Sequence, residues 1–185
     1  MWWNRRNLVF STVTLVSLVL DQATKAWVVA NVDLYRGEIQ IIPGFFSIVH
    51  AQNPGAAFSM LADMENRHVL FMAMTVVALF IVGDLFRQLE REDVFMSATL
   101  GLLLSGALGN AIDRARQQYV TDFLRFYTDD PGWTAWLAQY GLGNEYPSFN
   151  VADSALVVGV LMFLLTYTFK KDAGPVNEPA ASAPT

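Results

Sequence analysis

Residues 8–30 read LVFSTVTLVSLVLDQATKAWVVA, an apolar run that only Asp21 and Lys25 interrupt with charge. A helix of about 20 apolar residues crosses a bilayer, so this run is long enough to do so. Three further runs of the same character follow, at roughly 69–86, 94–112 and 150–169. Together they predict a membrane α-helical fold with four transmembrane helices.

The composition supports a membrane protein and excludes several other classes. The 185 residues are 54% hydrophobic, and the charged residues are concentrated between the apolar runs. A net charge of −5 without a basic patch argues against a nucleic-acid partner. The chain has no cysteine, which excludes disulfides, thiol catalysis, cysteine-ligated metals and a lipid anchor on cysteine.

Charges beside the runs predict their orientation. Arg5 and Arg6 before the first run are typical of a secretion signal, but no small-x-small cleavage site follows, so we expect a retained helix. Lysine and arginine in short flanks mark the cytoplasmic side of a membrane protein. They occur before the first run, between the second and third, and after the fourth: Arg5, Arg6, Arg87, Arg91, Lys170 and Lys171. This pattern predicts that both termini are cytoplasmic.

The two long links carry structure of their own. Alternating and β-branched residues broken by Pro-Gly and Asn-Pro-Gly predict short strands at about 38–60, and QQYVTDFLRFY, 117–127, predicts another. Residues 61–68 are typical of a short interfacial helix. We expect one membrane-embedded domain over 1–170 and a disordered, Pro- and Ala-rich tail over 171–185.

Small residues recur at four-residue spacing in the third and fourth runs, at Gly101, Ser105, Gly109, Ala155 and Gly159. Such spacing predicts close helix packing.

Polar residues inside membrane spans are costly and are the candidates for a site. Asp21 and Lys25 are one helical turn apart, which favours a structural ion pair, with support of an active site as the alternative. Asn110, Asp113 and Arg114 project from one side of a helix. They are either a solvated helix end, or Asp113 orients Arg114 and a polar backbone binds to Arg114 or Asn110.

Two acids stand out in the second half of the chain. Asp153 lies one turn inside the fourth run, behind Asn150, which is also a candidate helix N-cap. Asp122 in YVTDFLRF, taken alone, is equally well a solvated acid. A pair of neighbouring carboxyl groups shares a proton, so that one activates water while the other protonates a carbonyl oxygen. With only His50 and His68 and no HExxH motif, other hydrolytic sites have less support.

The stretch NPGAAFSM, 53–60, places a tight polar turn between apolar segments. A connecting turn is one interpretation. The other is that Asn53 and the backbone around Gly55 hold a ligand.

Five motifs in order resemble the lipoprotein signal peptidase (signal peptidase II) family: DQATKAW, NPGAAFS, GALGNAIDR, VTDF and FNVADSA. The resemblance covers most of residues 8–170. It implies an aspartyl endopeptidase that cleaves prolipoproteins before a diacylglyceryl-modified cysteine, in the bacterial inner membrane, with its active site near the periplasmic face. It also implies a small extracytoplasmic β-cradle, contact with membrane lipids, no cofactor or metal, and inhibition by globomycin.

The resemblance assigns residues as follows. Asp122 and Asp153 would be catalytic. Asn53, Gly55, Asn110, Arg114 and Asn150 would bind substrate, and Asp21, Lys25 and Asp113 would support the site. The two acids are 31 positions apart, a longer spacing than the resemblance leads us to expect, with the excess in 128–148.

Two other functions remain to be compared. A small membrane transporter or proton relay would place carboxylates at several depths. A signal-peptide binder without catalysis would need neither acid. The 128–148 segment, with Trp133, Trp136, Leu137 and Tyr140 on one helical stripe, is either a helix resting on the membrane or a lid close to the two acids.

Overall fold

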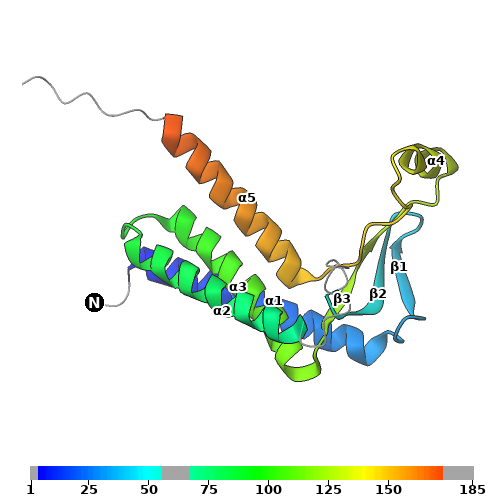
Figure 1. Ribbon diagram of the computed structural model, residues 1–185, viewed down its shortest axis with the longest axis horizontal. Coiled ribbons are helices and arrows are strands. Elements are labelled where there is room, and N and C mark those ends of the chain that lie inside the picture. The colour runs from blue at the N-terminus through cyan, green and yellow to red at the C-terminus, as the bar shows by residue number, and fades with distance from the viewer. Residues whose placement is uncertain (1–3, 56–66, 173–185) are drawn as a thin grey trace, which may run out of the picture.

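The computed structural model describes residues 4–55 and 67–172. Its elements, in chain order, are α1 (Arg5–Asn31), β1 (Glu38–Ile42), β2 (Phe46–Asn53), α2 (Arg67–Gln88), α3 (Val94–Gln117), β3 (Val120–Phe126), α4 (Pro131–Gln139) and α5 (Val151–Asp172). The predicted interfacial helix at 61–68 and the predicted tail lie mostly outside the described residues. Four long helices form one part of the molecule, and the sheet with α4 forms the other (Figure 1).

The helices have the character expected of membrane spans. By length and composition, three helices of the described chain can cross a bilayer, namely α1, α2 and α3. The fourth predicted span is formed by α5, whose described apolar part, Val151–Thr166, is shorter. Large side chains stay exposed on the outer faces, such as Leu15, Phe80 and Leu161, which are 62%, 76% and 55% exposed. A soluble protein would bury such residues, whereas a lipid-facing surface needs them.

Helix α3 is the centre of the bundle, with α1, α2 and α5 packed against it. The small residues predicted for close packing perform that role. A side chain at Gly101 would meet the Phe10 carbonyl oxygen at 3.0 Å, and one at Gly159 would meet Leu103 Cδ2 at 2.8 Å and Leu103 N at 3.3 Å. Backbones this close leave no room for a methyl group, so the predicted packing is confirmed.

The charge pattern predicted that the flanks rich in lysine and arginine lie on one side of the helices. Arg6 at the start of α1 donates a hydrogen bond to the Leu89 carbonyl and lies 4.8 Å from the Phe86 ring, at the α2–α3 link. The start of α1 and the last turns of α5 lie toward the same end of the molecule, opposite the sheet (Figure 1). The flanks that carry Arg5, Arg6, Arg87, Arg91, Lys170 and Lys171 therefore lie toward one end of the molecule.

The sheet is small and antiparallel, in the order β1-β2-β3. After α4, the chain returns along β3 through bridges at Leu124–Phe149 and Tyr127–Glu145. Its core contact with the helices comes from Phe123, which packs with Val28 and Val32 at the end of α1. The strands predicted near 38–60 are confirmed as β1 and β2, with 56–60 outside the described residues, and the strand predicted at 117–127 is confirmed as β3, which follows closely after α3.

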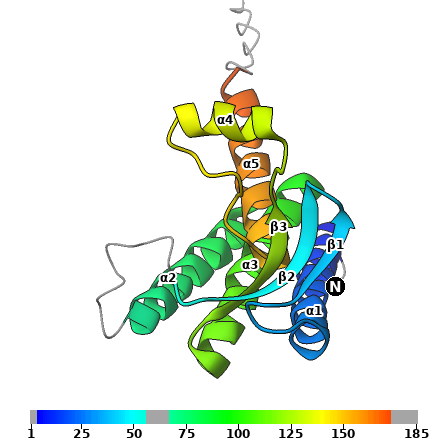
Figure 2. The ribbon, with the colours of Figure 1, turned by 90° about the vertical axis from the view of Figure 1, so that its right-hand side faces the viewer.

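Helix α4 confirms the predicted short helix, with the Asp130 side chain accepting a hydrogen bond from Trp133 N at 2.9 Å and Pro131 at its start. Its position corrects one expectation. The lid hypothesis placed this segment close to both acids, but β3 and the returning chain carry it to the far end of the sheet (Figures 1 and 2). Phe126, which precedes α4, is four residues beyond Asp122, or roughly 13 Å along an extended strand.

Candidate active site

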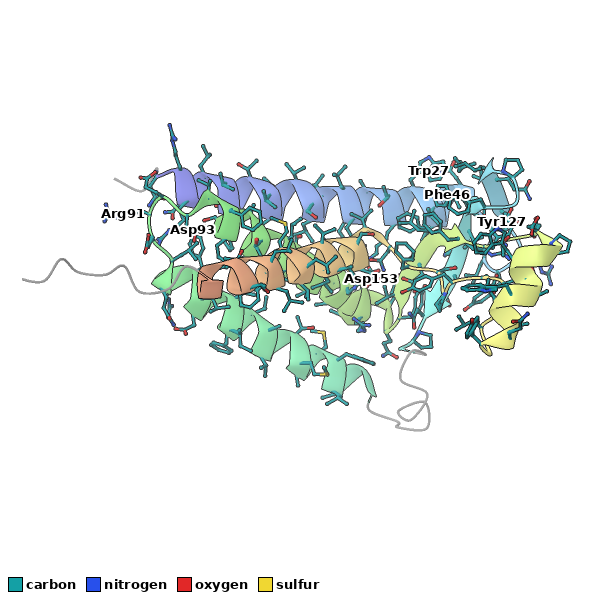
Figure 3. All side chains as sticks on the ribbon, turned by 90° about the horizontal axis from the view of Figure 1, so that it is seen from above. Trp27, Phe46, Arg91, Asp93, Tyr127 and Asp153 are labelled. Carbon is teal, nitrogen blue, oxygen red and sulfur yellow. The ribbon has the colours of Figure 1, made fainter. Side chains whose placement is uncertain are left out.

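Asp122 and Asp153 approach one site from different elements. Asp122 lies in the middle of β3, where it pairs with Ala51 of β2, and is only 2% exposed. Asp153 lies in the first turn of α5 and is half-buried. Figure 3 places Asp153 at the end of the helices that adjoins the sheet, away from Arg91 and Asp93.

Asparagine side chains connect the two acids. Asn150 Nδ2 donates to Asp122 Oδ1 at 2.7 Å, while the Asn150 backbone N–H donates to Asp153 Oδ2 at 3.2 Å. Asn110 Nδ2 donates to Asp153 Oδ1 at 2.7 Å. Asn150 also accepts from Asp153 N at 2.9 Å, so its predicted N-cap role is confirmed and forms a reciprocal capping arrangement. A residue that touches both carboxylates holds them in one polar network.

The environment of Asp122 favours its protonated form. The pKa of Asp122 is raised to about 6, mainly by burial and also by the negative charge of Asp153, while hydrogen bonds from Asn53 and Asn150 act to lower it. A carboxyl group with a pKa in this range holds or releases a proton near neutral pH. It is therefore equipped for acid–base chemistry.

The Asn53-Pro54-Gly55 turn reaches the same carboxyl group. Asn53 Nδ2 donates to Asp122 Oδ2 at 2.9 Å, and Asn53 Oδ1 accepts from Gly55 N at 2.8 Å. Gly55 has a φ of +101°, and a side chain there would lie 2.5 Å from the Phe71 ring. Glycine is required on both counts, and the turn holds Asn53 against the acid. Residues 56–60 of the NPGAAFSM stretch lie outside the described residues.

Behind the acids lies a buried ion cluster. Lys25 Nζ is 2.9 Å from Asp21 Oδ2 and 3.0 Å from Asp113 Oδ2. The same ammonium donates to Asn110 Oδ1 at 3.1 Å. The predicted Asp21–Lys25 pair is therefore confirmed as a contact, and it is joined to the asparagines that hold the two acids.

The cluster also fixes the elements that carry the acids. Asp21 Oδ1 accepts from Ala152 N at 2.8 Å, at the start of α5. Asp113 Oδ2 accepts from Thr121 N at 3.1 Å, next to Asp122 in β3. A carboxylate that satisfies a free N–H at a helix start stabilises that helix. Both acids are thus positioned through backbone bonds to the cluster.

One predicted pairing is wrong. We expected Asp113 to orient Arg114, but Asp113 binds Lys25 instead. The Arg114 guanidinium lies 4.6 Å from the centre of the Phe71 ring and donates to Asn110 O at 3.5 Å. Successive residues on a helix point about 100° apart, so the two side chains diverge.

Two residues of the site escaped the sequence analysis. Gln22 Nε2 donates to Asp21 Oδ2 at 3.0 Å, Asp113 Oδ1 at 3.3 Å and Gly109 O at 3.2 Å. Its only sequence signal is a place beside Asp21 in an apolar run. Phe71, on α2, contacts Arg114 and faces Gly55, and nothing in an apolar helix marks one phenylalanine among many. Within 4–55 and 67–172, His, Asp and Glu side chains form no group of three or more suited to holding a metal ion.

Comparisons with known proteins agree on one family. The sequence profile described as Signal peptidase (SPase) II matches residues 13–169. A lipoprotein signal peptidase from Geobacter metallireducens is 43% identical over 157 residues, covering 85% of this chain and 88% of that protein. Another, from Pseudoalteromonas atlantica, is 35% identical over 177 residues, covering 95% and 98%.

Solved structures give the same result for the fold. A bacterial membrane enzyme determined by the in meso method at 2.3 Å resolution superposes with a TM-score of 0.74 and 25% identity, covering 92% of this chain and 93% of that one. A second, at 1.9 Å resolution, has a TM-score of 0.71 and 26% identity, covering 85% and 91%.

Proposed function

This chain belongs to the signal peptidase II family, and from that premise we propose that Asp122 and Asp153 are its catalytic dyad. It is a multi-pass membrane protease that removes signal peptides from prolipoproteins. What we propose is the mechanism. Its main support is the position of Asn150, which donates hydrogen bonds to Asp122 at 2.7 Å and to Asp153 at 3.2 Å.

The two acids have different tasks in this mechanism. We assign the proton to Asp122, whose pKa is raised, and the role of general base to Asp153. The Asp153 carboxylate takes a proton from water as the water oxygen bonds to the scissile carbonyl carbon. Asp122 gives its proton to the carbonyl oxygen. The tetrahedral intermediate then collapses: one of its two hydroxyl groups returns a proton to Asp122 as the carbonyl reforms, the C–N bond breaks, and the leaving nitrogen takes the proton held by Asp153.

Around the dyad, Asn53, Gly55, Asn110, Arg114 and Asn150 bind the substrate backbone, and Asp21, Lys25 and Asp113 hold the network in place. The substrate is a prolipoprotein cleaved before its diacylglyceryl-modified cysteine, and globomycin inhibits the reaction. Residues 1–170 form the peptidase domain in the inner membrane, with both termini cytoplasmic and the dyad near the periplasmic face. The arginines at the end opposite the sheet support this orientation.

Two variants test the dyad. Asp122→Asn and Asp153→Asn should each abolish cleavage of a diacylglyceryl-modified prolipoprotein by the purified protein, followed as a size shift on a gel. Asp84→Asn, at an exposed position of α2, is the matched control and should cleave normally. The variants should keep the detergent-solubilised size and helical content of the parent chain. Turnover close to that of the parent in either dyad variant would show that the mechanism is wrong.

A further inference from the structure

The segment 128–147 carries a row of aromatic side chains that the peptidase site does not use. On α4, the rings of Trp133 and Trp136 lie 5.8 Å apart, and those of Trp136 and Tyr140 lie 5.0 Å apart. The three side chains are 61%, 48% and 64% exposed. Helical spacing of three and four residues puts them on one face. A continuous aromatic row left open on one face marks an interaction surface.

The position of α4 indicates what this surface meets. Figure 2 looks nearly along α1, and in this view α4 runs across the picture. It lies at the level of the sheet and in the direction of α5, beyond the outline of α1–α3 (Figures 1 and 2). The side chains of α5 that stay exposed, such as Val157, Leu161 and Leu164, need lipid around them. With the spanning helices crossing a bilayer, α4 would lie along the membrane plane, on the side where that lipid begins.

We propose that α4 and its flanking loops lie in the lipid headgroup layer and bind a membrane lipid there. Tryptophan and tyrosine favour this layer because each ring has an apolar body and a polar tip. An apolar cleft of about 880 Å³ separates α4 from the end of the sheet, lined among others by Phe126, Trp133 and Leu142. An acyl chain from the adjoining leaflet supplies the apolar surface that such a cleft needs.

Charge sets the type of lipid contact. The segment 128–147 contains Asp129, Asp130 and Glu145, and no lysine or arginine. Polybasic segments gain affinity from anionic lipids, whereas this segment has the opposite sign. Its attachment is therefore driven by aromatic and apolar contact, and anionic lipid does not strengthen it.

Tryptophan fluorescence in bilayer nanodiscs tests the proposal. The chain has five tryptophans, so replacing Trp2, Trp3 and Trp27 with phenylalanine leaves Trp133 and Trp136 as the reporters. The full-length protein is placed in phosphatidylcholine nanodiscs whose lipids carry bromine near the headgroup or at the middle of the bilayer. A second variant keeps only Trp27, which is 51% exposed near the sheet end of α1, as a spanning-helix control.

We expect the headgroup-proximal bromine to remove most of the emission of Trp133 and Trp136, and the deep bromine to remove little. Adding phosphatidylglycerol should not increase the quenching. Emission that neither bromolipid changes, but that aqueous acrylamide quenches, would overturn the proposal. So would quenching that is stronger with the deep bromine. A change seen only on adding prolipoprotein would also overturn it, because the surface would then bind substrate.

Discussion

At the scale of single residues, the Asp122 carboxyl group links structure to pH dependence. Its pKa is raised to about 6, mainly by burial, while the Asn53 hydrogen bond lowers it. The proposed mechanism needs Asp122 protonated, and the protonated fraction falls as the pH rises through the pKa. We therefore expect kcat/KM to decline by about tenfold per pH unit well above the apparent pKa of the coupled pair.

Substituting Asn53 should shift the pH at which kcat/KM begins to decline, and the direction of that shift can be predicted. Asn53→Ala removes a hydrogen bond that stabilises the charged carboxylate, so the pKa of Asp122 rises and the decline begins at higher pH. Measuring kcat/KM as a function of pH checks this. Asn144→Ala in the α4 loop is the control, and it should leave the pH of the decline unchanged. If the decline of kcat/KM in Asn53→Ala began at the same or a lower pH, Asn53 would not stabilise the Asp122 carboxylate.

The stability of the ion cluster depends on its only lysine. Lys25→Met leaves the Asp21 and Asp113 carboxylates buried beside each other without a cation. Breaking a buried pair in this way costs about 3–5 kcal/mol. Thermal unfolding in detergent measures the loss. Adding Asp113→Asn to Lys25→Met should recover part of the lost stability, because the repulsion between the Asp21 and Asp113 carboxylates is removed. No recovery would mean that the two carboxylates are not coupled.

Phe71 connects α2 to the site through Arg114. Phe71→Leu removes the ring under the guanidinium, and a desolvated cation–π contact is worth about 2 kcal/mol, or roughly 30-fold in an equilibrium. We expect Phe71→Leu to lower kcat/KM by up to that factor and Phe71→Tyr to retain most activity. Phe80→Leu, 76% exposed on the same helix, is the control. A double-mutant cycle with Arg114→Ala gives the coupling, and strict additivity would refute it.

At the scale of elements, α1 and α3 pack so closely at Gly109 that no side chain fits there. A methyl group at Gly109 would lie 2.5 Å from Asp21 Oδ2 and 3.0 Å from Ala152 Cβ. Gly109→Ala therefore has to displace the carboxylate that caps α5. We expect destabilisation of about 1–3 kcal/mol together with loss of activity. Gly83→Ala, where nothing lies within 4 Å, should change neither. Equal effects at the two glycines would contradict this.

At the scale of the whole molecule, α4 stands apart from the reaction. Replacing residues 129–146 with a few Gly and Ser residues removes the aromatic row but leaves the strand that carries Asp122. We expect near-normal cleavage in detergent and a severalfold loss in bilayers, where the segment attaches the sheet to the surface. Steady-state rates in both media check this. Equal losses in the two media would place the segment in catalysis instead.

The sequence predicted the helices and strands well because those signals are local. The apolar runs, the turn chemistry around Pro54-Gly55 and the Asp21–Lys25 spacing all depend on near neighbours. Long-range partners were less accessible. Asp113 was assigned to Arg114 because they are adjacent, while Lys25 is far away in sequence. The roles of Gln22 and Phe71 and the distance of α4 from the acids depend on how the elements are arranged in space.

The hydrogen bond that Ala152 N donates to the Asp21 carboxylate joins α5 to α1. Synthesis proceeds from the amino terminus, so a growing chain holds Asp21, Lys25, Asp113 and Asp122 well before Asp153 leaves the ribosome. Until α5 arrives, the chain has only one acid of the proposed pair. On the proposed dyad, the protease becomes competent only after α5, which carries Asp153, has entered the membrane.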